Sequence, residues 1–266
     1  MMGHETELCN HLGRTPEERL LLRRVLDQSV GAVRKCEPCR TPFLTPRECA
    51  LAKQLIAALG HPSHRFEGGY PEAERQVCVF LPDWLEPEDE LPEPYGLAAL
   101  RAVWYEGDTL GHRDILGALM GLGIRRETVG DLLVSQHSCD ILLLPEILPY
   151  LRENFTQAGR VKLKLSEIPL SELSVPPIAK KIIHGTVSSL RLDAVAATGF
   201  GTSRAKMTEA ISSGRVSLNH LECTHADQAV AEGDVLACRG MGKCRLAEVG
   251  GLSRKGRVSI TVERYI

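Results

Sequence analysis

The residues of this sequence best suited to chemistry lie between positions 190 and 219. They are basic residues interleaved with apolar residues at helical spacing, and two hydroxyl residues where a second short helix would begin: Arg191, Arg204, Lys206, Arg215, Thr202 and Ser203. Between residues 178 and 221, six Lys and Arg face two Asp and Glu, a net charge of 6 − 2 = +4, whereas the whole chain carries −2. This concentration of positive charge predicts binding of a polyanion.

The order of these residues fits the phosphates of a folded RNA. Thr202 or Ser203 can cap the second helix, whose first amide groups and positive dipole end favour a phosphate. Arg204 and Lys206 add charge in the same helical turn. Arg191 opens the neighbouring helix, and Arg215 follows the second one. Because the deep major groove of an RNA duplex hides the base edges, such a patch would recognise shape and phosphate. The alternative is a solvated basic face, and the ordered pattern favours RNA.

Asn219 and His220 are expected to form the tight turn of a hairpin after these helices. Asn and His tolerate the left-handed backbone conformation better than most residues, so the turn can form without glycine. We include Asn219 among the predicted RNA contacts and interpret His220 as a turn residue.

The stretch Gly240-Met241-Gly242-Lys243-Cys244 superficially resembles a phosphate-binding loop. It lacks the spacing and the Lys-Ser/Thr ending of a Walker motif, so nucleotide binding is not predicted. A Gly-rich turn near the RNA face, with Lys243 available to a phosphate, is predicted instead. Arg254, Lys255 and Arg257 stand in another turn and are interpreted as solvated.

The densest polar group outside this region lies between residues 112 and 131. It comprises His112, Arg113, Asp114, Arg125, Arg126, Glu127 and Asp131. A histidine beside an aspartate suggests acid–base catalysis, but no nucleophile elbow, Cys/His signature or metalloprotease motif accompanies them. Asp114 and Glu127 can act as first-turn charges or ion-pair partners. We interpret the group as structural, or as a second binding surface formed by His112, Arg113, Arg125 and Arg126, and predict no catalytic residue.

Four residues offer the ligand types of a metal site. Cys36 and Cys39 have the C-x-x-C spacing of zinc ligands, and His61 and His64 follow. A predicted helix separates the two pairs, and two short motifs coincide easily by chance. We therefore predict no metal and no cofactor, and leave zinc binding at these four residues open.

The elements that position these residues define an α+β protein. Residues 17–35 and 46–59 have helical periodicity, with Thr15 and Glu18 as a capping box for the first helix. Strands and helices from residue 75 to 167 follow the order β-β-α-β-β-α-β, with helices on one face of a largely antiparallel sheet. The acidic, proline-rich stretch 82–96 is expected to be a solvated, mobile loop.

The predicted organisation has four parts. These are an N-terminal helical region (1–65), a ferredoxin-like, RRM-like α/β domain (66–170), a linker with a lead-in strand (171–186), and a small RNA-binding domain (187–266). Length and a 43% hydrophobic content suit two ordinary cores. No apolar run approaches the ~20 residues of a membrane-spanning helix, and no signal peptide is apparent. Nine scattered cysteines indicate a reducing compartment rather than a disulfide framework.

Two ordered sets of residues resemble known families. The C-terminal set is similar to the RNA-binding domain named after small-subunit ribosomal protein S-four: Leu190-Arg191-Leu192-Asp193, Thr202-Ser203-Arg204-Ala205-Lys206, Gly214-Arg215-Val216, Asn219, Gly233-Asp234-Val235 and Arg239-Gly240. The upstream set resembles the YlmH family, which includes the photosystem II S-four proteins: Asp108, Gly111-His112-Arg113-Asp114-Ile115-Leu116-Gly117, Gly121 to Glu127 and Val129-Gly130-Asp131. GGYPEAER and the ending RKGRVSITVERYI are most similar to the photosynthetic branch.

The resemblance implies a non-enzymatic protein that binds structured RNA, either ribosomal RNA or tRNA. It implies the ribosome as partner, with the large subunit expected, and a role in ribosome assembly or rescue of stalled complexes. We expect a monomer that does not bind membranes, located in the cytoplasm or, in a photosynthetic eukaryote, the plastid stroma. Two alternatives stay open. One is an RNA-modifying enzyme that holds RNA with its C-terminal domain, and the other is an adaptor that docks a protein through loop 82–96 and the N-terminal helices.

Overall fold

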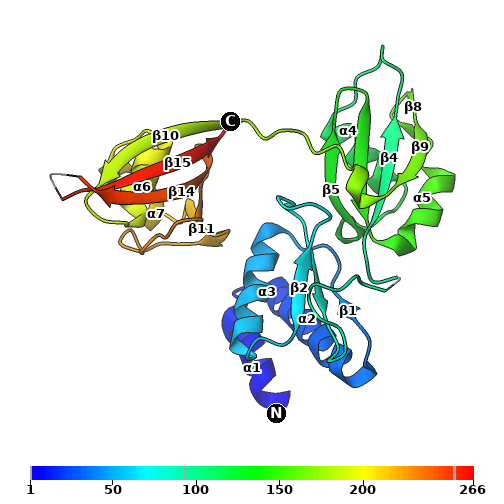
Figure 1. Ribbon diagram of the computed structural model, residues 1–266, viewed down its shortest axis with the longest axis horizontal. Helices are drawn as coiled ribbons and strands as arrows, with labels where there is room; N and C mark the ends of the chain where they lie inside the picture. The colour runs from blue at the N-terminus through cyan, green and yellow to red at the C-terminus, as the bar shows by residue number, and fades with distance from the viewer. Residues whose placement is uncertain (1, 93, 254–255) are drawn as a thin grey trace. The chain divides into compact units, whose positions relative to one another are not determined.

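The structure is a computed structural model that describes residues 2–92, 94–253 and 256–266. It divides the chain into two compact units, Met1–Pro176 and Pro177–Ile266 (Figure 1). The predicted turn residues Arg254 and Lys255 lie outside the described residues. The finer division into four parts stays a prediction.

Three helices form the N-terminal part of the first unit: α1 (Met2–Leu12), α2 (Pro16–Lys35) and α3 (Pro46–Ala58). The capping box predicted at Thr15 and Glu18 is present, and Thr45 with Glu48 forms a second one at α3. In each box the threonine hydroxyl accepts the third amide of the helix while the glutamate accepts the cap amide. The sequence did not predict α1.

A three-stranded antiparallel sheet packs with these helices. Its order is β1 (Cys39–Arg40), β3 (Val77–Phe80) and β2 (His64–Glu67). The sequence pattern had assigned the strand near 75–81 to the ferredoxin-like sheet, and this is wrong. All four residues of β3 are buried, so the strand has no solvated face and its alternation gives no indication of which sheet it joins.

The ferredoxin-like domain begins with β4 (Ala98–Val103) and continues with α4 (His112–Gly121), β5 (Val129–Val134), β6 (Ser138–Leu143), α5 (Leu148–Asn154) and β9 (Lys164–Ile168). The sheet order is β5-β6-β4-β9, and all neighbouring strands are antiparallel. This βαββαβ order confirms the ferredoxin-like prediction (Figure 1). Short 3₁₀ turns lie at Arg126–Thr128, Pro145–Ile147 and Leu170–Glu172, and β7 (Gln157–Ala158) and β8 (Val161–Lys162) form a small hairpin.

The two faces of this four-stranded sheet are covered differently. Leu100, Ile141 and Leu143 pack beneath α4 and α5. On the opposite face Ala99 and Leu142 pack against Phe43 and residues of the three-stranded sheet. Hydrophobic burial on both faces therefore joins the N-terminal part and the ferredoxin-like domain into one unit.

Two segments predicted to be loop or linker make specific contacts with the first unit. Stretch 82–96 is anchored: Leu85 is buried, the Trp84 indole donates to the Cys36 carbonyl at 2.9 Å, and Arg65 donates to the Pro87 carbonyl at 2.7 Å. The first part of the predicted linker belongs to the first unit, because the Ser174 amide donates to Asp140 at 2.7 Å. Leucines explain both cases, since Leu85 is buried and Leu173 is partly buried within segments whose overall composition is polar.

The second unit packs two helices on one face of a six-stranded sheet. The helices are α6 (Leu192–Phe200) and α7 (Arg204–Ser212), and the sheet order is β10-β15-β14-β13-β11-β12 (Figure 1). The strands are β10 (Lys180–Val187), β11 (Val216–Leu218), β12 (Leu221–Glu222), β13 (Val235–Cys238), β14 (Gly242–Leu252) and β15 (Val258–Tyr265). A Cβ at Gly199 would lie 2.9 Å from the Cys244 Sγ, so glycine lets α6 approach β14 closely. All nine cysteines are free thiols.

Candidate nucleic-acid interface

A buried aspartate joins the start of α6 to the start of α7. The Asp193 side chain is 4% exposed and lies within 3.3 Å of the Arg191 guanidinium and 3.0 Å of the Arg204 guanidinium. Burial raises the pKa of Asp193, but hydrogen bonds and charge from Arg204 and Arg191 outweigh this and hold the pKa below its ordinary value. The ionised carboxylate thus fixes two arginines beside each other, and their side chains remain 39% and 49% exposed.

The first turn of α7 is built to present amide groups and charge. Gly201 ends α6 in the left-handed conformation (φ 65°), and the Thr202 amide donates to the Ala197 carbonyl at 3.0 Å. Of the two predicted caps, Ser203 is the one that acts, since its hydroxyl accepts the Lys206 amide at 3.3 Å. The Arg204 and Lys206 side chains are exposed in this turn. The earliest amides of a helix have no intrahelical acceptor, so this end can receive a phosphate oxygen.

The start of α6 differs, because the chain itself takes up its amides. The Leu192 amide donates to the Gln228 carbonyl at 2.8 Å, and the Asp193 amide donates to the Ala226 carbonyl at 3.0 Å. Arg191 therefore contributes a side chain to the interface, while the amide groups come from α7.

Arg215 follows α7 and is exposed. Gly214 takes a positive φ (69°) to turn the chain, and the Arg215 Nε donates to the Ser213 hydroxyl at 3.1 Å. Its backbone carbonyl accepts the Arg239 amide at 3.0 Å, which anchors the residue at the start of β11.

One predicted RNA contact has structural partners within the second unit. Asn219 lies in the hairpin turn (φ 48°), and its side chain donates to Asp234 at 2.8 Å and accepts the Val235 amide at 2.9 Å. Both polar ends of the amide are engaged in joining two loops. His220 also has a positive φ (69°), as the turn prediction required.

Lys243 lies within β14, rather than in a free Gly-rich turn. Its Nζ is 4.6 Å from the centre of the Tyr265 ring. The next residue, Cys244, is buried in the core under α6, so alternation places Lys243 on the sheet face opposite the helices. Arg257, predicted to be solvated, donates to the Thr186 hydroxyl at 3.0 Å.

The four residues of the predicted second surface differ in their surroundings. Arg126 donates to the carbonyls of Val129 and Gly130, and burial, with the nearby charge of Arg75, lowers its pKa. Arg125 pairs with Glu127 at 3.1 Å and stays 74% exposed. His112 and Arg113 are exposed at the start of α4, where Asp114 accepts the Gly111 amide at 2.8 Å. The charges at Asp114 and Glu127 are thus a helix-start cap and an ion-pair partner, as predicted.

Asp131 fastens the N-terminal part to the ferredoxin-like domain. Its carboxylate accepts the Tyr70 hydroxyl at 2.8 Å, the Glu74 amide at 2.7 Å and the Arg75 amide at 3.2 Å. Arg75 in turn donates to the carbonyls of Phe43 and Val129, at 3.0 and 3.2 Å. Two family-like motifs far apart in sequence, GGYPEAER and VGD, therefore meet in one structural joint.

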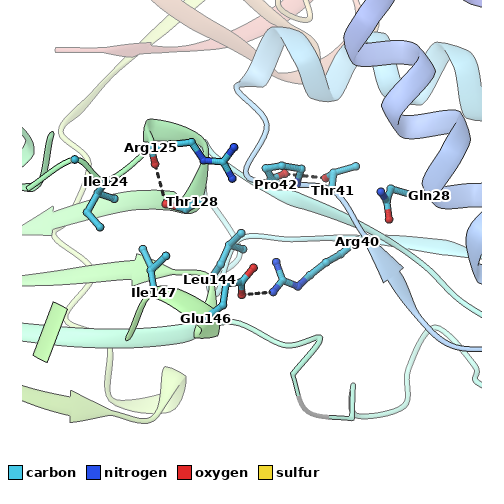
Figure 2. A pocket seen from close by; sticks show the side chains of 11 residues that line it. Gln28, Arg40, Thr41, Pro42, Ile124, Arg125, Thr128, Leu144, Glu146 and Ile147 are labelled. Atoms are coloured by element: carbon cyan, nitrogen blue, oxygen red, sulfur yellow. Dashed lines mark hydrogen bonds and ion pairs between the residues drawn. The ribbon is translucent and has the colours of Figure 1, made fainter. Parts of the chain in front are cut away.

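A cavity of about 430 Å³ is lined by polar residues, among them Arg40, Thr128 and Glu146, and by apolar ones such as Leu144 and Ile147 (Figure 2). Arg40 reaches Glu146 across it at 2.6 Å, and Thr128 donates to the Arg125 carbonyl at 2.8 Å. Arg40 and Glu146 thus pair with each other, and His112 and Asp114, the residues named for the alternative RNA-modifying enzyme, are not among the lining residues. The sequence did not indicate Arg40, which is 11% exposed, because its partner is 106 residues away.

The proposed metal ligands are not brought together. No group of three or more His, Cys, Asp or Glu able to hold a metal occurs among the residues that the structure describes. Cys36 is exposed at the end of α2, whereas Cys39 is buried in β1. Within the same described residues, no helix is long and apolar enough to cross a membrane.

Comparisons with known proteins match this arrangement segment by segment. Family models described as "YlmH, N-terminal", "Putative RNA-binding domain in YlmH" and "S4 domain" match residues 17–83, 105–172 and 190–236. The chain is 33% identical over 225 residues to "Ribosome-associated protein quality control protein P2" of Bacillus subtilis (strain 168), an alignment that covers 84% of this chain and 86% of the relative. In fold it resembles "Cell division protein ylmH from Streptococcus pneumoniae", with a TM-score of 0.51 and 24% identity over 62% of this chain and 98% of that one.

Proposed function

The chain belongs to the YlmH family, and we propose that it binds structured RNA, ribosomal RNA or tRNA, on the ribosome. Two matched domains support RNA as the ligand, and the B. subtilis relative is ribosome-associated by name. Within this proposal the site lies on the large subunit, and the protein acts in ribosome assembly or in rescue of stalled complexes. It acts as a monomer in the cytoplasm or, in a photosynthetic eukaryote, the plastid stroma.

The observation that carries the proposal is the shared carboxylate of Asp193. Two arginines held on one buried anion lose little further side-chain freedom when they meet a phosphate, which lowers the entropic cost of binding. The first amides of α7 and the Lys206 ammonium add donors to the same place. The result is a preformed cradle for an RNA backbone whose shape, rather than base sequence, decides the fit.

We propose that the protein carries out no catalysis. The residues that suggested acid–base chemistry have structural partners: Asp114 accepts a helix-start amide, and Asp131 accepts three donors at the joint. The matched families are RNA-binding and ribosome-associated ones, which supports the same view.

The test is cosedimentation with large ribosomal subunits, using Lys206→Ala/Arg215→Ala, a double variant that leaves the Asp193 cluster intact. We expect weaker binding, and a salt dependence of log K reduced by about 2 because two phosphate contacts are lost. Arg34→Ala/Lys35→Ala removes the same charge from exposed positions of α2 and is the matched control. Binding by the Lys206/Arg215 variant equal to that of the control would contradict the proposal.

A further inference from the structure

The ferredoxin-like domain cannot use the sheet face with which RRM-type domains stack bases. None of its four strands contains an aromatic residue. One half of the outer face, at Ala99 and Leu142, is covered by the N-terminal sheet. Nearby, Arg101 pairs with Asp140 at 2.6 Å, and the Arg101 guanidinium also donates to the Glu172 carbonyl at 2.7 Å. If this domain contacts RNA, the contact lies elsewhere.

A row of cations follows the edge of the domain. Arg160, Lys162 and Lys164 are exposed and alternate with residues that pack on the core, Val161, Leu163 and Leu165. Alternation in extended chain directs the three cations to solvent. None of their side chains forms a hydrogen bond or ion pair with another described residue. They are therefore available to an anionic partner.

Arg113 faces this row across a groove. A hollow of about 530 Å³ separates α4 from the β7–β8 hairpin, and both Arg113 and Arg160 line it. Arg113, like the row, has no partner among the described residues. The acid in the groove, Asp114, is already bonded to the Gly111 amide at 2.8 Å. Two arginines from segments 47 residues apart in sequence (160 − 113) thus line the same groove.

An exposed aromatic side chain stands at the end of the row. Tyr105 is 76% exposed, and it comes two residues after Val103, which is in register with Lys164. Glu106 and Asp108 occupy the same turn and limit the positive charge. A few phosphate contacts with one stacking platform suit a single strand better than a duplex, because a duplex hides its base faces.

We propose that Tyr105, Arg113, Arg160, Lys162 and Lys164 form a strip that binds single-stranded RNA. The strip adds a second contact to the RNA-binding function proposed above and rests on it. Tyr105 stacks a base while the four cations hold the phosphates on either side. The domain thus binds RNA along its edge, at the β7–β8 hairpin and the start of β9, rather than on the part of the sheet face that is covered at Ala99 and Leu142.

The experiment measures binding of the full-length chain to two probes, an oligouridine of about 12 nucleotides and a blunt RNA hairpin. Arg160→Ala/Lys162→Ala/Lys164→Ala is compared with Arg24→Ala/Arg34→Ala/Lys35→Ala, which removes the same charge, three exposed cations, from α2. We expect the strip variant to weaken oligouridine binding about 10-fold or more and to reduce its salt slope by about 2, with hairpin binding unchanged.

Two further variants separate the possible failures. Tyr105→Ala should weaken oligouridine binding about 5- to 100-fold without changing the salt slope, because it removes stacking and no charge. Lys206→Ala/Arg215→Ala should weaken hairpin binding alone. If the strip variant binds oligouridine as tightly as the α2 control does, the proposal that the strip binds RNA is overturned. Hairpin affinity unchanged in the Lys206/Arg215 variant would instead overturn the proposed function of the S4 domain.

Discussion

Two groups of similar composition, each with one aspartate and two arginines, do different work in the two units. In the second unit Asp193 accepts Arg191 and Arg204 side chains, which stay 39% and 49% exposed. In the first unit Asp131 accepts two backbone amides and a tyrosine hydroxyl, while the guanidinium groups of Arg75 and Arg126 donate to backbone carbonyls. The two groups differ in the acceptors to which their arginines donate. Arginines placed on a carboxylate still present charge outward, whereas arginines placed on carbonyls hold the fold together.

The largest effect is expected on stability, at the group around Asp131. Asp131→Ala removes the acceptor of three hydrogen bonds and should destabilise the first unit by about 2–4 kcal/mol. Both tryptophans, Trp84 and Trp104, lie in this unit, so urea unfolding followed by tryptophan fluorescence reports on it alone. Glu153→Ala, an exposed position on α5, is the control. A midpoint equal to that of the control would show that Asp131 is not part of the joint.

At the group around Asp193, a substitution should change the affinity for RNA. Asp193→Asn makes the chain more positive by one charge, so simple attraction predicts tighter binding. Positioning predicts the opposite, because the two arginines lose the anion that fixes them. We expect hairpin RNA to bind about 5- to 50-fold more weakly, a loss of about 1–2 kcal/mol. Fluorescence anisotropy at constant salt distinguishes the two, and tighter binding would mean that net charge alone accounts for the interface.

The same carboxylate should give the second unit a pH dependence. Because Arg204 and Arg191 hold the pKa of Asp193 below its ordinary value, the ionised form stabilises the fold above the unfolded-state pKa of about 4. That stabilisation is lost as the pH falls through the folded-state pKa. The protection factors of amides 190–212, the intrinsic exchange rates divided by the observed rates at the same pH, should therefore fall below about pH 4 in the wild-type chain. They should fall less in Asp193→Asn. An equal fall in both would assign the effect to other carboxylates.

Much of both regions could be predicted from local patterns. The helix caps, the βαββαβ order and the charge concentration around Arg204 each depend on residues a few positions apart. Local sequence patterns therefore predict them. The joint at Asp131 was not predicted, because it depends on partners 56 to 61 residues away. Asp193 was counted only as a charge that offsets the basic residues. Its burial, which makes it the organiser of the cluster, follows from tertiary packing.

The smallest effect is expected at Lys243, where sequence and structure differ most. The sequence places this lysine in a turn beside the RNA-binding helices, whereas β14 directs it to the opposite sheet face, over Tyr265. Lys243→Ala should therefore change hairpin RNA affinity less than about 2-fold, because a charge on the far face contributes only through the screened field of the whole unit. Lys206→Ala removes the same charge from the face with Arg204 and should cost more. Anisotropy titrations of both variants test whether the second unit is divided into a binding face and a sheet face. A loss of affinity in Lys243→Ala equal to that in Lys206→Ala would mean that RNA reaches around the sheet edge to Tyr265.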